Sequence, residues 1–300
     1  MGVIEARGLS KAYGGRRVVS DFNMSVAAGD IYGFVGKNGA GKSTVMKMIC
    51  AEVAPTAGEV VLFDGAPGGA RRIGVLIEQP GLLPGLSAYE NVMAKGMAWG
   101  MPDASARAHE VLRLVGLDAT GRRKVRGFSL GMKQRLGLAL ALLGSPDVLL
   151  LDEPFNGLDP EGTRAMRNLI VRLNDAMGVT VVISSHVLDQ LDRFATRYGV
   201  IVDGRMVREV TAEEVAAECT SSLRIRVADG PRGLALLEEV FPQVRFTVQP
   251  DGALVVTGPH DGEAIARCLA EGGHTVLELT RQTRDVEDYF VELMEGGRHV

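Results

Sequence analysis

The chain has 300 residues and a formal net charge of −4, with 46% hydrophobic and 23% charged residues. This is the composition of an ordinary globular protein, and the length predicts two domains. The sequence pI of about 5.8 gives no overall attraction to nucleic acid. Three widely spaced cysteines without a C-x-x-C pair predict inert thiols in a reducing compartment.

No stretch of the sequence is typical of secretion or of membrane insertion. Residues 1–9 carry Glu5 and Arg7 and lack a long apolar core, so we expect no signal peptide. The most apolar stretch, residues 136–151, is interrupted by glycine, proline and aspartate, and it is shorter than the ~20 apolar residues that a membrane helix needs. To act at a membrane, the chain would need a partner that spans it.

Short apolar runs alternate with helical patterns through the N-terminal part of the chain. Strands are predicted over residues 3–9, as an edge strand, and over 18–26, 31–35, 59–63, 72–78, 147–151, 179–183 and 198–202. Helices are predicted over residues 87–99, 103–115, 129–143, 160–177 and 186–195, with Asp103 and Ser129 as N-caps. This alternation predicts an α/β fold with a largely parallel sheet covered by helices, and the stretch 87–143 predicts an inserted helical subdomain.

The pattern changes after about residue 220. Strands are predicted over residues 223–227, 244–248, 253–256 and 274–279, and helices over 233–241, 261–270 and 285–294. Before the final helix the order is β-α-β-β-α-β, which is the ferredoxin-like order. We therefore expect a first domain over residues 1–219 and a small α+β domain over residues 220–300.

Residues 36–43 read G-x-x-x-x-G-K-S, the pattern of a phosphate-binding loop. A strand is predicted before the loop and a helical pattern follows it, which is the context that this pattern requires. Glycines let backbone N–H groups converge on phosphate, and the helix N-terminus adds positive potential. Lys42 is expected to reach the β- and γ-phosphates, and the Ser43 hydroxyl to hold Mg²⁺. The predicted binding residues are Gly36, Asn38, Gly39, Gly41, Lys42, Ser43 and Thr44.

The apolar run 148–151 ends in two carboxylates, Asp152 and Glu153. Asp152 suits the Mg²⁺ shell, directly or through water, and Glu153 suits a general base that polarises an attacking water. An edge strand closed by two solvated acids is the alternative. The phosphate-binding loop upstream favours the catalytic interpretation.

Residues 128–135, FSLGMKQR, open a predicted helix. With this segment the chain resembles the ATP-binding cassette (ABC) ATPases, the nucleotide-binding subunits of ABC transporters. Their signature is L-S-G-G-Q, of which Ser129 and Gly131 match strictly, and Gln134 and Arg135 also fit. The resemblance implies a P-loop ABC cassette in which this segment contacts ATP bound to another subunit.

Three further residues stand where the resemblance implies a function. Tyr13 lies upstream of the phosphate-binding loop, where an aromatic residue stacks on adenine. Asp159 ends the D-loop segment 156–159, which would cross a dimer interface. His186 matches the switch histidine that contacts the γ-phosphate, and it follows a predicted strand, where open α/β sheets place their sites. The implied catalytic residues are Glu153, His186 and Lys42.

The segment after the strand predicted over residues 72–78 departs from the family pattern. The family usually has a glutamine there, which touches Mg²⁺ and the attacking water. The best alignment places Glu78 in this position, and a slip of one residue would place Gln79 there. With an acid in this position, the chain resembles the subgroup that exports lantibiotics, bacitracin and related peptides. A carboxylate still offers oxygen to Mg²⁺, so Glu78 joins Ser43 and Asp152 as a predicted metal ligand.

The resemblance implies ATP hydrolysis coupled to export through a separate membrane permease. Two ATP molecules would be enclosed in a homodimer, or in a heterodimer with a second such subunit. The subgroup implies peptide antibiotics or drugs as cargo, with other cargo classes left open, and a place in the cytoplasm on the inner face of the membrane. A soluble ABC ATPase that acts on ribosomes or DNA is the alternative. A single cassette without a long coiled-coil insertion disfavours it, and we expect no nucleic-acid partner.

Overall fold

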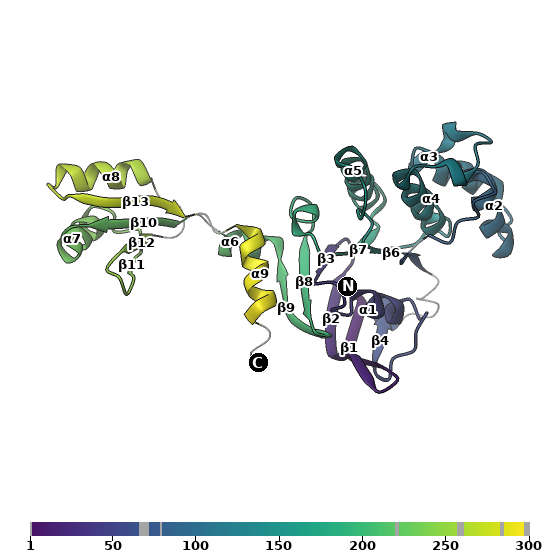
Figure 1. Ribbon diagram of the computed structural model, residues 1–300, viewed down its shortest axis with the longest axis horizontal. Coiled ribbons are helices and arrows are strands. Elements are labelled where there is room, and N and C mark those ends of the chain that lie inside the picture. Colours follow the sequence, from purple (N-terminus) through teal and green to yellow (C-terminus); the bar gives the residue numbers. More distant parts are fainter. Residues whose placement is uncertain are drawn as a thin grey trace. The chain divides into compact units, whose positions relative to one another are not determined.

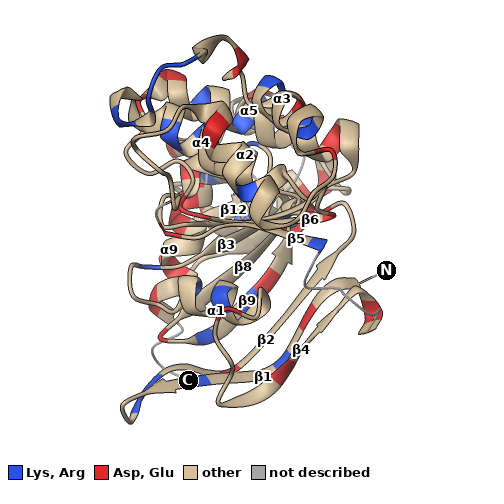
Figure 2. Ribbon diagram, turned by 90° about the vertical axis from the view of Figure 1, so that its right-hand side faces the viewer, with Lys and Arg blue, Asp and Glu red and all other residues tan. Residues whose placement is uncertain are grey.

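The structure is a computed structural model that describes residues 2–65, 72–78, 80–219, 222–256, 261–282 and 285–296. Its contacts divide the chain into two compact units, Met1–Ala212 with Leu293–Val300, and Glu213–Glu292. The sequence placed a boundary after residue 219, and the contacts place it at the start of helix α6, Ala212–Glu218. Figure 1 labels most of the helices and strands of both units, and strand β5 is labelled in Figure 2.

The larger unit contains a six-stranded sheet with the order β5-β6-β7-β3-β8-β9. Its strands are Ile31–Val35 (β3), Ile73–Leu76 (β5), Val148–Asp152 (β6), Thr180–Ser185 (β7), Arg197–Val202 (β8) and Arg205–Thr211 (β9). All neighbours in this sheet are parallel except β8 and β9. Every residue of β3, β6 and β7 is buried, which explains their unbroken apolar character. The predicted parallel α/β sheet is confirmed, and β9 is an addition to it.

A second sheet of three antiparallel strands has the order β2-β1-β4. Its strands are Gly2–Tyr13 (β1), Arg16–Ala27 (β2) and Ala57–Leu62 (β4). In β1, Ile4 pairs with Val26 on one side and with Leu62 on the other. The prediction of an edge strand over residues 3–9 is therefore wrong. Alternation of apolar residues reports which face of a strand is buried, and it does not report whether the strand has one neighbour or two.

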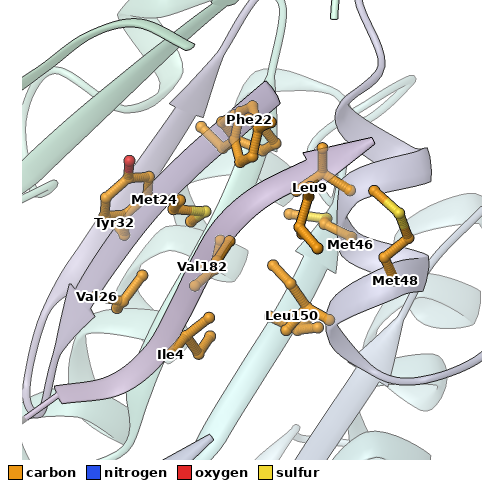
Figure 3. Packing of buried hydrophobic residues seen from close by; sticks show 14 of the residues in the cluster. Ile4, Leu9, Phe22, Met24, Val26, Tyr32, Met46, Met48, Leu150 and Val182 are labelled. Atoms are coloured by element: carbon orange, nitrogen blue, oxygen red, sulfur yellow. The ribbon is translucent and has the colours of Figure 1, made fainter. Parts of the chain in front are cut away.

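The hydrophobic core of the larger unit joins both sheets to helix α1, Lys42–Ile49. Figure 3 shows Leu9 of β1, Met46 and Met48 of α1 and Leu150 of β6 within this cluster. Each of these side chains is 2% exposed or less, and burial of a side chain of this kind stabilises the fold by about 1.5–3 kcal/mol. The packing holds α1 against β6, and with it the loop between β3 and α1.

Helices α2 (Ala88–Ala98), α3 (Ala104–Leu114) and α4 (Leu130–Leu142) pack on one another, and α4 also contacts β5. Acidic and basic residues are interspersed over these helices (Figure 2). Ser129 caps α4 as predicted, because its hydroxyl accepts a hydrogen bond from Met132 N at 3.3 Å. Asp103 is at the N-cap of α3, where its side chain makes no capping bond to the described residues. Within the described ranges, every helix lacks the length or the apolar character needed to cross a bilayer.

The helix predicted over residues 186–195 is wrong. The structure has a short 3₁₀ turn, Leu188–Gln190, followed by irregular turns. The Ser185 hydroxyl accepts a hydrogen bond from Val187 N at 3.0 Å and donates to the Gln190 side chain or the Val187 carbonyl. Such side-chain bonds compete with the helical hydrogen-bond ladder. Helix α5, Pro160–Met177, has the predicted bounds.

The smaller unit contains a sheet with the order β11-β12-β10-β13, in which all neighbours are antiparallel. Its elements are Ser222–Val227 (β10), Gly230–Val240 (α7), Phe246–Val248 (β11), Leu254–Val256 (β12), Gly262–Glu271 (α8) and Val276–Gln282 (β13), and helix α9, Val286–Gly296, follows. Leu223 and Ile225 of β10 pack with Leu237 of α7 and with Ile265 of α8 in its core. The element order is the predicted one, and the ferredoxin-like classification stays a prediction.

Candidate functional site

The loop between β3 and α1 has a backbone that requires glycine. Gly41, at the N-cap of α1, has φ 109°, and Gly39 has φ 81°, both in the left-handed region. A Cβ atom on Gly36 would lie 2.6 Å from the Ile201 carbonyl oxygen. Glycine is therefore required in this loop for two reasons. Gly39 and Gly41 have a left-handed backbone, and Gly36 packs closely against β8.

Lys42 is held inside this loop. Its side chain is 6% exposed, and Nζ donates hydrogen bonds to the carbonyl oxygens of Gly36 at 2.6 Å and Lys37 at 3.3 Å. The same nitrogen lies 3.4 Å from Oε1 of Glu153, the residue that follows β6. A positive charge is thus fixed between the loop carbonyls and the acid.

The acidic pair at the end of β6 is oriented by a serine of β7. Asp152 pairs with Ser184 in the parallel ladder, and the Ser184 hydroxyl donates to Asp152 Oδ1 and accepts a hydrogen bond from Glu153 N at 3.0 Å. Ser184 was missing from the predicted site. Its only signal in the sequence is the polar Ser184-Ser185 step before His186, at the end of an apolar strand.

Glu153 connects the lysine to the histidine. Its Oε2 lies 2.8 Å from His186 Nδ1, and its Oε1 is buried and accepts no hydrogen bond from the described residues. The backbone of Glu153 is left-handed, with φ 49°. Such a conformation is uncommon for a residue with a Cβ, and strain of this kind gathers at functional sites. The Glu153 carboxylate therefore lies between Lys42 and His186.

A pocket of about 210 Å³ lies on the loop, and Glu153 forms part of its wall. Its lining consists of Val18, Asn38, Gly39, Gly41, Lys42, Ser43, Thr44 and Glu153. We call it the loop pocket. The structure thus brings the predicted phosphate-binding residues, apart from Gly36, to the predicted base. Tyr13 lies outside this lining; the residue is 47% exposed, with Lys11 Nζ 5.1 Å from the centroid of its ring.

Asp152 and Glu78 line a second pocket, which shares Glu153 with the loop pocket. Asp152 is 7% exposed, whereas the Glu78 side chain is 64% exposed. Glu78 has φ 59°, and its Oε1 lies 2.5 Å from Lys47 Nζ, on α1. Gln79, the alternative in this position, lies outside the described residues.

Ser129, Gly131 and Asp159 line a further pocket, together with Gly157 and Leu158. We call it the signature pocket. It lies at the N-termini of α4 and α5, because Ser129 caps one helix and Asp159 caps the other, accepting a hydrogen bond from Gly162 N at 2.8 Å. The predicted binding residues are therefore divided between two pockets of the same chain. The fold and the loop pocket define a P-loop nucleotide-binding protein.

Comparison with known proteins gives the family. The ABC transporter family model matches residues 19–156. The chain is 37% identical over 302 residues to the bacitracin transport ATP-binding protein BcrA of Bacillus licheniformis, with 98% of both chains covered. It is 39% identical over 210 residues to the lantibiotic transport ATP-binding protein SrtF of Streptococcus pyogenes, covering 69% of this chain and 90% of that one.

A solved structure, the dimeric ATP-binding cassette MJ0796 in a post-hydrolysis state bound to ADP and Pi, matches with a TM-score of 0.62 and 26% identity. The match covers 70% of this chain and 98% of that one. The chain belongs to the ABC transporter family and is one of its ATP-binding, ATP-hydrolysing subunits.

Proposed function

We propose that this ABC ATPase hydrolyses ATP with Glu153 as general base and that hydrolysis drives export through a membrane permease. The supporting observation is the Glu153 carboxylate, which lies between Lys42 Nζ at 3.4 Å and His186 Nδ1 at 2.8 Å in the wall of the loop pocket. A carboxylate beside a phosphate pocket can accept the proton of an attacking water.

The loop pocket would hold the phosphates of ATP. The N-terminus of α1 carries backbone N–H groups that favour anions, and Lys42 would contact the β- and γ-phosphates. His186 is joined to Glu153, and we assign it to the γ-phosphate end of the pocket. Tyr13 is half-exposed, and we assign its ring to a stacking contact with adenine.

The Ser43 hydroxyl and the Asp152 carboxylate offer the oxygen ligands that Mg²⁺ prefers. Ser43 lines the loop pocket, and the buried carboxylate of Asp152 is fixed by the hydrogen bond from Ser184. Glu78 offers a third oxygen ligand, a second carboxylate, from the adjoining pocket. When bound, Mg²⁺ would neutralise charge on the phosphoryl group that is transferred. Ser184 would keep Asp152 and Glu153 in one mutual orientation.

The signature pocket supports a composite site made by two subunits. Ser129 and Gly131 line a pocket that does not include the loop residues of the same chain. We propose that this pocket of one subunit covers ATP in the loop pocket of another, so that the two copies enclose two nucleotides. Asp159, in the same pocket, would lie at the dimer contact.

A groove of about 490 Å³ beside β5, α2 and α4 supports a permease partner. Val75, Leu76, Leu83 and Leu140 give it an apolar lining, and Val75 and Leu83 are exposed. The groove adjoins the segment that carries Glu78, and we propose that a cytoplasmic helix of the permease docks there. The protein would then lie on the inner face of the membrane. The named relatives transport bacitracin and a lantibiotic, so we propose peptide antibiotics or drugs as cargo.

Glu153→Gln tests the base. The amide keeps the shape of the side chain but cannot accept the proton, so we expect phosphate release to fall by about 10²–10⁴-fold. Binding of a fluorescent ATP analogue should persist, and gel filtration with ATP should show a trapped dimer. Glu59→Gln, at an exposed carboxylate paired with Arg7, is the matched control. Unchanged phosphate release in the Glu153 variant would contradict the assignment.

A further inference from the structure

Glu78 and Glu153 occupy equivalent places at one edge of the sheet. In the parallel ladder Leu76, the last residue of β5, pairs with Leu151 of β6, and Glu78 and Glu153 each come two residues after this pair. Both acids have a left-handed backbone, with φ 59° and 49°. The two carboxylates line one pocket, together with Asp152. The carboxyl end of a parallel sheet is where such folds bind ligands, so both acids belong to the nucleotide end of the molecule.

The two acids lie beside different lysine side chains. Glu153 is 21% exposed and lies 3.4 Å from Lys42. Glu78 is 64% exposed and receives a hydrogen bond of 2.5 Å from Lys47 Nζ. The bond to Glu78 raises the pKa of the Lys47 ammonium above its ordinary value. Lys47 is therefore the cation beside Glu78, as Lys42 is the cation beside Glu153.

Lys47 also lies on the same face of α1 as Ser43, a predicted metal ligand. Ser43 and Lys47 are four residues apart on α1, which places them on one face, one turn apart. Both are half-buried in a helix whose other residues, apart from Thr44, are buried. The Glu78 side chain thus lies beside the same face of α1 that presents the Ser43 hydroxyl.

We propose that Lys47 is a positioning residue that binds the Glu78 carboxylate. A divalent cation bound with the nucleotide must then compete with Lys47 for this carboxylate. This inference rests on the proposed function. One oxygen atom that accepts a charge-assisted bond from an ammonium group is a weaker ligand for a cation. Lys47 therefore raises the Mg²⁺ concentration that the nucleotide complex needs, and it offsets the charge that an acid in this segment adds beside the phosphates.

The experiment measures the Mg²⁺ concentration that gives half-maximal binding of a fluorescent ATP analogue. Lys47→Met removes the charge and keeps a residue that favours helix, and Lys47→Arg keeps the charge. In the methionine variant we expect the half-saturating Mg²⁺ concentration to fall about two- to fivefold, the range of an exposed ion pair. The arginine variant should stay near the wild type. Lys47→Gln repeats the test if the methionine variant is unstable.

Glu78→Gln provides the second arm of a double-mutant cycle. In a chain with glutamine at position 78, Lys47→Met should leave the Mg²⁺ requirement unchanged, because no carboxylate remains to be released. Higher salt should reduce the difference in half-saturating Mg²⁺ concentration between the wild type and Lys47→Met, because salt screens exposed charges.

Two results would overturn the inference. One is an unchanged Mg²⁺ requirement in Lys47→Met, or an equal change with glutamate and with glutamine at position 78. The other is weaker nucleotide binding by Lys47→Met in EDTA in both backgrounds, which would show that Lys47 contacts phosphate directly. A wild-type chain that binds no nucleotide with any Mg²⁺ concentration would overturn the proposed function itself, and this inference with it.

Discussion

The loop pocket and the signature pocket are built in different ways. In the loop pocket, side chains from α1, from the end of β6 and from the segment after β7 contact one another, and Lys42 is almost fully buried. In the signature pocket, Ser129 and Asp159 each bond to the first turn of their own helix, at exposed positions. The loop pocket is therefore organised by the tertiary structure of one chain. The signature pocket presents two locally capped helix ends, which suits a surface that another subunit meets.

Among the further variants, Lys42→Met is expected to have the largest effect. The change removes the ammonium group from between two carbonyl oxygens and the Glu153 carboxylate. We expect ATP hydrolysis to fall by about a hundredfold or more, since one preorganised group at a transferring phosphate has an effect of this size. Phosphate release and binding of a fluorescent ATP analogue measure it.

Lys37→Met is the matched control, because Lys37 belongs to the same loop with an exposed side chain. An equal loss of activity in both variants would mean that general positive charge, and not the buried contact of Lys42, supports the site.

Mixing two inactive variants would sharpen the comparison between the pockets. Ser129→Arg damages the signature pocket and leaves the loop pocket intact, whereas Glu153→Gln damages the wall of the loop pocket and leaves the signature pocket intact. In a composite dimer the mixed pair holds one intact site and one doubly damaged site. With random pairing we expect about a quarter of the wild-type rate, because half of the dimers are mixed.

The rate of the equimolar mixture is measured against each variant alone. A Ser129→Ala plus Ser129→Arg mixture is the control, because it restores no site. A mixture of the two inactive variants that is no faster than either variant alone would contradict a site shared in this way.

A smaller effect is expected from Ser184→Ala. The hydroxyl joins Asp152 to the backbone of Glu153, and its loss removes hydrogen bonds worth about 1.4 kcal/mol, which corresponds to about tenfold in kcat. Steady-state kinetics measure it. Thr180→Val, on the same strand, removes a hydroxyl that accepts from Gly29 N away from the pocket. We expect that control to lower stability and leave kcat unchanged; equal kcat in both variants would count against the positioning role of Ser184.

The smallest effect concerns the N-terminus of helix α2, which lies outside the lining of both pockets. Glu90 bonds to Ser87 N and to Lys124, and the Ser87 bond is the main cause that lowers the pKa of Glu90 from 4.5 to about 2. The folded-state pKa is depressed, so this stabilisation is present above about pH 4.5 and is lost as the pH falls towards 2. Glu90→Gln should therefore flatten the pH dependence of the melting temperature in that window. Glu110→Gln, on α3, is the control, and an equal slope in wild type and Glu90→Gln would contradict the prediction.

Most regular elements could be predicted from periodicity, because burial of one face or two leaves a local mark in the sequence. Helix α5 has the predicted bounds, and the proline at its start and Gly178 at its end mark them. The helix predicted over residues 186–195 is absent, because the spacing of Leu188 and Leu191 is helical whereas the hydrogen bonds of Ser185 form a turn. The two-sided pairing of β1 depends on β4, which comes much later in the chain.

The sequence by itself determined the phosphate-binding loop, the apolar strand that ends in two acids, and the helix that Ser129 caps. Each depends on neighbours within a few residues, where glycine conformations, apolar runs and capping groups act directly. Only the tertiary structure decided that Glu153 lies between Lys42 and His186, that Ser184 orients the acidic pair, and that Lys47 holds Glu78. These contacts join segments that are distant in the chain, and the order of strands in the sheet, which no local period encodes, brings them together.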